Sequence, residues 1–424
     1  MRENTPEPCA EFIMSKNIVF CADGTWNGIA NDDNDDNEFE CSNVLKLFKS
    51  LKGVPEELNH VQPEEQEKVF TENGQLKQVA KYIHGVGDSN NWLIKNLEGI
   101  FGSGTIQRIV RGYTFISRHY QRDDKIFIVG FSRGAYTARA LAGMIASQGL
   151  LDAEKLNLAD ESEEHKAQAY RWGTAVWAEY RRKARHEPSW QDRIASFKRS
   201  LFGDDPGPVD PESMIFFVPV EMVAVWDTVG SLGIPHYNKD ERIDLFRFAD
   251  TALNDRVKLG RHAISLDEQR IDFTPVLWDA RQGIQQVLFP GAHSDVGGGY
   301  PEKESGLSNG AYHWMHEELA EAGLFLNPHH YVSDHRALCH CPWFNKEFYK
   351  TTARQLTSPL KKSLPYLFDG NYTLAVHQSV LERCAEEQVS IQDPVTGEIV
   401  SIPYRSDYLA GFIQDKEIMV VPVK

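Results

Sequence analysis

Cysteine is scarce in this sequence, with six residues among 424. Small domains held together by disulfides have a much higher density, so that class of fold is excluded. Cys339 and Cys341 flank His340, which is a soft-metal arrangement, but no second pair of ligands lies nearby in the sequence. We therefore predict no metal site and interpret these cysteines as reduced or buried thiols.

Positive charge is also in short supply. Lys and Arg number 45 against 61 Asp and Glu, which gives a formal net charge of −16. Nucleic-acid binding depends on Lys and Arg that displace counterions from phosphates, and docking on anionic membranes depends on basic clusters. The acidic balance therefore argues against both as the main function. We predict no nucleic-acid partner, and at most a transient contact with a membrane surface.

The sequence has no apolar run near the length of about 20 residues that spans a bilayer. Residues 1–15 have neither the basic start nor the apolar core of a secretory signal peptide. We therefore expect a chain that is cytoplasmic when synthesised. Export by a route that uses no signal peptide stays open.

Short β-branched runs alternate with helical patterns along the chain. The predicted strands are Asn17–Ala22, Val79–Ile83, Lys125–Gly130, Val220–Trp226 and Gln286–Phe289. The predicted helices are Gly104–Tyr120, Arg133–Gln148 and Asn309–Ala322. This alternation is typical of an α/β fold with a mostly parallel central sheet and helices on both faces.

The length allows one large α/β domain. We predict an N-terminal tail over residues 1–15, the main domain over 16–330, and a C-terminal extension over 331–424 packed on it. Residues 152–210 interrupt the alternation with a charged, aromatic helical insertion. Its Tyr170, Trp177 and Tyr180 share one helical face. The insertion can be a lid over the sheet or an ordinary packed helix, and the sequence leaves both open.

The strongest chemical signal is Gly130-Phe131-Ser132-Arg133-Gly134. The pattern G-x-S-x-G is frequent by chance, but here a buried strand leads in and an amphipathic helix leads out. This context indicates a nucleophile elbow, in which a tight turn presents the serine hydroxyl above the carboxyl edge of the sheet. We predict Ser132 as the nucleophile.

A serine hydroxyl needs a base to react at neutral pH. His293 follows the predicted strand at Gln286–Phe289 and precedes a run of three glycines, which makes it the first choice. His84 and His377 are the alternatives. His84 also follows a strand, but it precedes the nucleophile, against the chain order of this fold.

The orienting carboxylate should lie at another strand end between the nucleophile and the base. Asp227 follows the strand Val220–Trp226 and fits this position. Asp267 and Asp295 are the alternatives. Asp295 is only two residues from His293, too close in sequence to reach the far ring nitrogen.

The oxyanion hole needs two backbone N–H donors, one of them from the residue after the nucleophile. Arg133 is that residue, and Gly24 or Thr25, after the first strand, is the second donor. Three further side chains next to these turns are expected to contact the substrate: Asp23, Trp26 and Tyr300.

Five motifs then occur in a fixed order: DGTWN, HGVG, GFSRGAYTARALAG, WDTVGSLG and HSDVGGGY. As a set they resemble the α/β-hydrolase domain of unknown function that includes the first class of type VI secretion lipase effectors. The resemblance runs from about residue 16 to residue 308. It implies an α/β-hydrolase fold, with Ser132 as nucleophile, Asp227 as acid and His293 as base. For the secreted members it also implies a phospholipase-type activity.

These observations predict a serine hydrolase that cleaves carboxylic esters, of lipase or phospholipase type, through an acyl-enzyme. Its partner would be an ester or lipid substrate, and the chemistry requires no metal or organic cofactor. Two alternatives stay open. One is a noncatalytic or lipid-binding module that keeps the hydrolase fold. The other is an acyltransferase that passes the acyl group to an acceptor other than water.

Overall fold

The structure of the chain is a computed structural model. It describes residues 15–24, 41–55, 65–85, 101–160, 162–184, 209–229, 252–346, 349–352, 367–368, 371–372, 374–406, 409 and 419–422. The structural statements below concern these residues. Two of the predicted site residues, Thr25 and Trp26, lie outside them.

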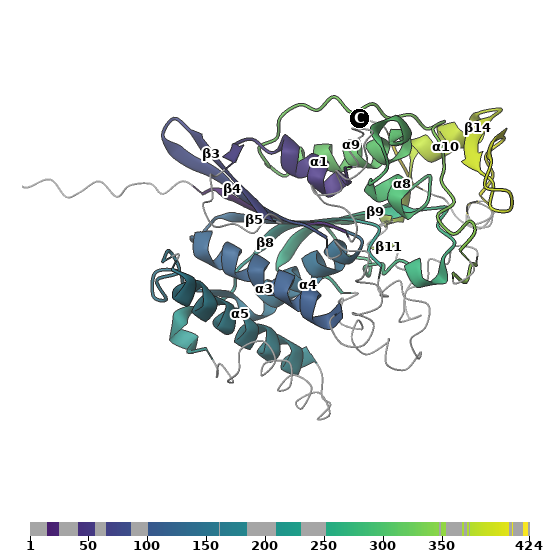
Figure 1. Cartoon of the computed structure of the whole chain (residues 1–424). Helices are drawn as coiled ribbons and strands as arrows, with labels where there is room; N and C mark the ends of the chain where they lie inside the picture. Colours follow the sequence, from purple (N-terminus) through teal and green to yellow (C-terminus); the bar gives the residue numbers. More distant parts are fainter. Residues whose placement is uncertain are drawn as a thin grey trace, which may run out of the picture.

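A ten-stranded sheet forms the centre of the molecule (Figure 1), in the order β16-β13-β10-β9-β8-β5-β1-β4-β3-β2. The parallel strands are β1 (Asn17–Ala22), β4 (Gln75–Ile83), β5 (Lys125–Phe131), β8 (Val220–Trp226), β9 (Val257–Ser265), β10 (Ile284–Phe289), β13 (Leu374–His377) and β16 (Met419–Val421). At one edge β3 (Glu65–Glu72) and β2 (Val54–Pro55) run antiparallel. The predicted mostly parallel sheet is confirmed.

Helices cover both faces of this sheet (Figure 1). On one face α3 (Phe101–His119) and α4 (Arg133–Gln148) bury their apolar sides against the strands. On the other face lie α1 (Asn43–Ser50) and α9 (Gly306–Glu321). Apolar residues at helical spacing, such as Ile109, Tyr113 and Ile116 of α3, are fully buried. Burial of these stripes stabilises the layered arrangement.

The predicted helical insertion contains α5 (Glu163–Ala184), which lies outside α3 and α4 (Figure 1). Its Val176, Trp177 and Tyr180 are buried in the same apolar cluster as those two helices. At its base β6 (Leu150–Leu151) pairs with β7 (Met214–Ile215), next to the 3₁₀ turn Pro211–Ser213. The described part of the insertion is therefore a packed helix. Residues 185–208 of the insertion lie outside the described residues, and the lid stays a prediction for the insertion as a whole.

The C-terminal region is more than an extension packed on the sheet, because two of its segments are strands of the sheet. β13 pairs with β10, and β16 pairs with β13. The same region carries α10 (Gln378–Ala385) and two hairpins, β14 (Val389–Gln392) with β15 (Ile399–Ile402) and β11 (Leu367–Phe368) with β12 (Asn371–Tyr372). Strands of three and four residues are too short to show a clear pattern in the sequence.

Among the helices that the structure describes, none has the length and apolar composition to cross a membrane.

Candidate active site

Ser132 occupies a sharp turn between β5, which ends at Phe131, and α4, which begins at Arg133. Its backbone has φ 56° and ψ −120°, a conformation that costs a residue other than glycine about 1–3 kcal/mol. The glycines around it are required by close approach. A Cβ at Gly134 would lie 2.0 Å from the carbonyl oxygen of Ala22, and one at Gly130 would lie 2.3 Å from that of Gly134. This is the geometry expected of a nucleophile elbow.

The structure brings together the three residues predicted to be catalytic, at the carboxyl ends of β5, β8 and β10. The Nε2 atom of His293 lies 2.8 Å from the hydroxyl oxygen of Ser132. Its Nδ1 atom lies 2.7 Å from Oδ2 of Asp227. Both spacings are hydrogen-bond distances. The three side chains form one continuous chain from a buried carboxylate to the hydroxyl.

Asp227 is held from a neighbouring strand. Its side chain is fully buried, and Ser265 at the end of β9 donates to both oxygens, through its backbone N–H to Oδ1 (3.0 Å) and through its hydroxyl to Oδ2 (2.9 Å). The backbone N–H of Asp227 donates to the carbonyl of Ala263 at 2.7 Å. A carboxylate held on both oxygens presents a fixed acceptor to the histidine ring.

Two aromatic rings flank the imidazole of His293. The centroid of Phe131 lies 4.7 Å from that of the imidazole, and Phe273, in the 3₁₀ turn Ile271–Phe273, meets it edge-on at 4.9 Å. His293 keeps only 4% of its surface exposed. The flanking rings restrict rotation of the imidazole.

The alternative bases have other partners. His84 contacts the ring of Tyr82. His377 stacks on Phe289, and its Nδ1 accepts the backbone N–H of Ser379. Burial, together with the charge of His313, lowers the pKa of His377 to about 4.

The alternative acids also have other partners. Asp267 accepts hydrogen bonds from the hydroxyl of Tyr404. Asp295 accepts one from the ring of His340. Of the three predicted acids, Asp227 is therefore the one within hydrogen-bond distance of the His293 ring.

Asp23 and Gly24 follow β1, directly beneath the elbow. The carboxylate of Asp23 is fully buried and accepts from three groups: the N–H of Gly24 (2.6 Å), the hydroxyl of Ser42 (2.6 Å) and the hydroxyl of Tyr82 (2.5 Å). Burial raises the pKa of Asp23 to about 6, although these hydrogen bonds and the charge of Arg108 oppose the shift. The contacts assign the carboxylate to holding this turn.

The other predicted site residues lie close by. Arg133 begins α4, which places its backbone N–H at the elbow. Burial and the charge of Arg108 lower the pKa of Arg133 to about 9. Tyr300 follows the glycine run and stacks on His340, with ring centroids 3.6 Å apart.

Several residues of the site carried no usable signal in the sequence. Ser265 ends β9, a strand that the sequence does not predict, and Glu268 follows it closely and binds Arg270. His340 and Tyr404 lie far along the chain. The sequence does single out their partners, Asp295 and Asp267, but only as alternative acids for the histidine.

The described residues contain no group of three or more His, Cys, Asp or Glu side chains placed to hold a metal ion. His340, the centre of the Cys-His-Cys sequence, has both ring nitrogens on carboxylates, Asp295 at 2.6 Å and Glu304 at 3.1 Å. Among the cysteines that the structure describes, Cys339 and Cys341 are free and buried.

A sequence model of one protein family matches residues 16–318, well over half of the chain. Its description is "T6SS, Phospholipase effector Tle1-like, catalytic domain". The chain belongs to this family. The match to this Tle1-like chain contains the elbow serine, Asp227 and His293, and it stops before His340 and Tyr404.

Similar proteins include an uncharacterized protein of Saccharomyces cerevisiae, 26% identical over 279 residues, which are 63% of this chain and 34% of the yeast protein. A crystal structure of an uncharacterized protein from Pseudomonas aeruginosa shares 19% identity, with a TM-score of 0.39, over 74% of this chain and 46% of that one. The Tle1 effector bound to the VgrG spike of the type 6 secretion system shares 19% identity, with a TM-score of 0.35, over 68% and 52%. The Tle1-like chain thus spans about a third of the yeast relative and about half of each solved chain.

Proposed function

We propose that this Tle1-like chain is a serine hydrolase with an α/β-hydrolase fold, which cleaves carboxylic esters of phospholipids through an acyl-enzyme. The observation that carries the proposal is the hydrogen-bonded chain Asp227–His293–Ser132, built on a strained serine at the carboxyl edge of a parallel sheet. Geometry and roles, more than sequence position, identify such a triad.

In the first half-reaction the Ser132 hydroxyl oxygen attacks the ester carbonyl carbon while Nε2 of His293 takes its proton. Asp227 accepts the hydrogen bond from Nδ1–H, which fixes the tautomer and stabilises the imidazolium. The backbone N–H of Arg133 and a second donor from Gly24 or Thr25 hold the developing oxyanion. To serve as this donor, the backbone N–H of Gly24 must first break its hydrogen bond to the carboxylate of Asp23.

The tetrahedral intermediate then collapses. The carbon–oxygen bond to the alcohol breaks, and His293 gives its proton to the leaving alcohol oxygen. In the second half-reaction water attacks the acyl-enzyme, His293 again takes a proton, and the fatty acid leaves Ser132 with its hydroxyl restored. The reaction consumes one water and releases one acid and one alcohol.

The phospholipid substrate is proposed from the family to which the chain belongs, described as phospholipase effectors. The site is consistent with an ester substrate, because its three catalytic side chains and the oxyanion donors complete the acyl-transfer chemistry by themselves.

The test of the nucleophile uses a fluorophosphonate probe followed by peptide mapping of the intact chain. We expect a single adduct on Ser132, lost in Ser132→Ala and strongly slowed in His293→Ala. Ser147→Ala is the matched control, since the hydroxyl of Ser147 bonds only to groups of the same helix α4, the carbonyls of Gly143 and Met144 and the side-chain amide of Gln148. Full labelling of the Ser132→Ala variant, or an adduct elsewhere, would overturn the proposal.

The test of the substrate compares fatty-acid release from phosphatidylcholine vesicles with hydrolysis of a short p-nitrophenyl ester. Turnover of both, each lost in Ser132→Ala, supports a phospholipase. Turnover of the short ester without any release from vesicles would contradict the phospholipid assignment and keep the hydrolase.

A further inference from the structure

The loop that carries His293 is held by carboxylates. Three successive backbone N–H groups each donate to a different side chain: Gly291 to Asp267 (2.6 Å), Ala292 to Asp295 (2.9 Å) and His293 to Glu268 (3.2 Å). All three acceptors lie within the residues that the family match covers. The position of the imidazole therefore depends on where these carboxylates are held.

Glu268 is fixed locally, because the guanidinium of Arg270 donates to both of its oxygens, at 2.9 and 2.7 Å. The other two carboxylates are fixed from the C-terminal region. The hydroxyl of Tyr404 lies 2.7 and 2.9 Å from the two oxygens of Asp267. The carboxylate thus bridges Tyr404 to the loop of His293.

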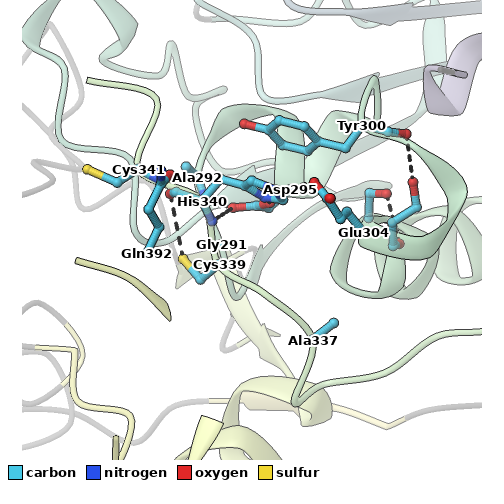
Figure 2. A network of polar contacts seen from close by, with 12 residues as sticks. Gly291, Ala292, Asp295, Tyr300, Glu304, Ala337, Cys339, His340, Cys341 and Gln392 are labelled. Atoms are coloured by element: carbon cyan, nitrogen blue, oxygen red, sulfur yellow. Dashed lines mark hydrogen bonds and ion pairs between the residues drawn. The ribbon is translucent and has the colours of Figure 1, made fainter. Parts of the chain in front are cut away.

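Figure 2 shows the corresponding contacts of Asp295, the third residue of the short helix α8 (His293–Gly297). His340 donates to it twice, through its backbone N–H at 3.0 Å and through its ring Nδ1 at 2.6 Å. The same ring stacks on Tyr300 and reaches Glu304 with Nε2 at 3.1 Å.

The two carboxylates around His340 favour its charged form. Burial by itself lowers the pKa of the ring, but the hydrogen bonds and charges of Asp295 and Glu304 outweigh it and raise the pKa above its ordinary value. Hydrogen bonds from a charged donor to a carboxylate are about twice as strong as neutral ones. Since Nε2 is bonded to Glu304, His340 is not placed to act as a second base on a hydroxyl.

We propose that His340 and Tyr404 are positioning residues of the active site, which hold the loop of His293 through Asp295 and Asp267. The inference rests on the proposed function and deepens it. It assigns to the C-terminal region, beyond the family match at residues 16–318, a task in catalysis: without it the imidazole loses its alignment between Ser132 and Asp227.

The experiment measures kcat and KM on a short ester, and the rate of fluorophosphonate labelling, for His340→Gln, Tyr404→Phe and the double variant of the full chain. We expect kcat and the labelling rate to fall about tenfold in each single variant, because misplacement of a catalytic group by a fraction of an ångström already costs much of its effect. KM should stay within about twofold, since the variants leave the elbow and the oxyanion turn intact.

The matched control is His335→Gln. His335 also lies between two carboxylates, Glu386 at 2.9 Å and Glu382 at 3.5 Å. These glutamates belong to α10 and the residue after it, and not to α8, which carries His293. Its variant should keep the wild-type kcat and labelling rate.

Wild-type kcat and labelling rates in both His340→Gln and Tyr404→Phe would overturn the inference, and so would an equal loss in His335→Gln. Tyr404→Phe removes only one oxygen and should fold, so its kcat and labelling rate alone test the inference if His340→Gln does not fold. Failure of the wild-type chain to label on Ser132 would instead contradict the proposed function, so the two failures are distinguishable.

Discussion

Asp23 is a buried carboxylate one residue away from the proposed oxyanion turn, and its pKa is raised to about 6 chiefly by burial. The folded state therefore binds its proton more tightly than the unfolded chain. The stabilisation this supplies is complete at low pH and is lost as pH rises from about 4 through about 6. A shift of about two pKa units corresponds to roughly 3 kcal/mol.

Asp23→Asn removes this titration. We expect the unfolding free energy of the variant, relative to wild type, to increase by up to about 3 kcal/mol between pH 4 and pH 7. Urea unfolding at several pH values measures it. Glu154→Gln, at an exposed carboxylate, is the control and should show a constant difference. A constant difference for Asp23→Asn as well would contradict the raised pKa.

The support that Ser265 gives to the proposed triad can be tested by removing a single hydroxyl. Ser265→Ala removes the donor at 2.9 Å from Oδ2 of Asp227, the oxygen that also faces His293, and leaves the backbone N–H at 3.0 Å in place. We expect kcat to fall about tenfold, against about 10⁴-fold for Asp227→Asn, which reverses the tautomer preference of the histidine. Ester hydrolysis kinetics measure both. Equal losses in the two variants would show that Ser265 has a larger role than support.

At the scale of elements, the elbow and the end of β1 are in direct contact. A Cβ at Gly134 would lie 2.0 Å from the carbonyl oxygen of Ala22 and 2.6 Å from that of Asp23, so the start of α4 and the proposed oxyanion turn cannot move independently. We expect Gly134→Ala to destabilise the fold by several kcal/mol and to abolish probe labelling.

Gly310→Ala is the control for this substitution. Gly310 lies in α9, where a Cβ would approach the Cβ of Ser333 only to 3.9 Å. Alanine favours a helix interior by about 1 kcal/mol over glycine, so this variant should be slightly more stable and fully active. Thermal unfolding and labelling of both variants make the comparison. Normal labelling of Gly134→Ala would contradict the coupling.

The predictable elements are those in which a continuous local pattern of apolar residues indicates burial. β1, β8 and α4 match their predicted bounds because their patterns are uninterrupted and are bounded by turn residues. β9 escaped prediction although it lies in the middle of the sheet. Lys258, Gly260, Arg261 and His262 break its apolar run. Lys258 pairs with Glu221 of β8 and Arg261 with Glu318 of α9, and no local pattern reveals these partners.

At the scale of the whole molecule, the net charge of −16 bears on the lipid surface. A strongly acidic protein is repelled by anionic vesicles, and salt screens the repulsion over about 8 Å at physiological ionic strength. We expect slower fatty-acid release from vesicles containing phosphatidylglycerol than from pure phosphatidylcholine at low salt.

The difference between the two kinds of vesicle should shrink as sodium chloride is added. Release of fatty acid, followed at constant lipid concentration, measures it, and the short ester serves as the control because it is neutral. Faster release from the anionic vesicles at low salt would show that a local basic surface outweighs the net charge.

The part of the site that could be predicted consists of residues next to the ends of predicted strands. Ser132, Asp227 and His293 each follow an apolar run, so parallel strands alone place them at one edge. The support of His293 was not predictable, because Tyr404 meets Asp267 across a separation of 137 residues. Contacts of this length depend on the finished topology, and the sequence around Tyr404 gives no hint of them.

This separation also sets the order in which the site residues and their supporting residues are synthesised. A ribosome makes the elbow serine and both of its triad partners well before it makes His340 and Tyr404. The nascent chain therefore holds the proposed nucleophile while only Glu268, paired with Arg270, supports the histidine loop. The contacts of Asp295 and Asp267 with His340 and Tyr404 can form only when the C-terminal region is complete. The proposed hydrolase would thus gain its full reactivity as one of the last steps of folding, when the C-terminal strands join the sheet.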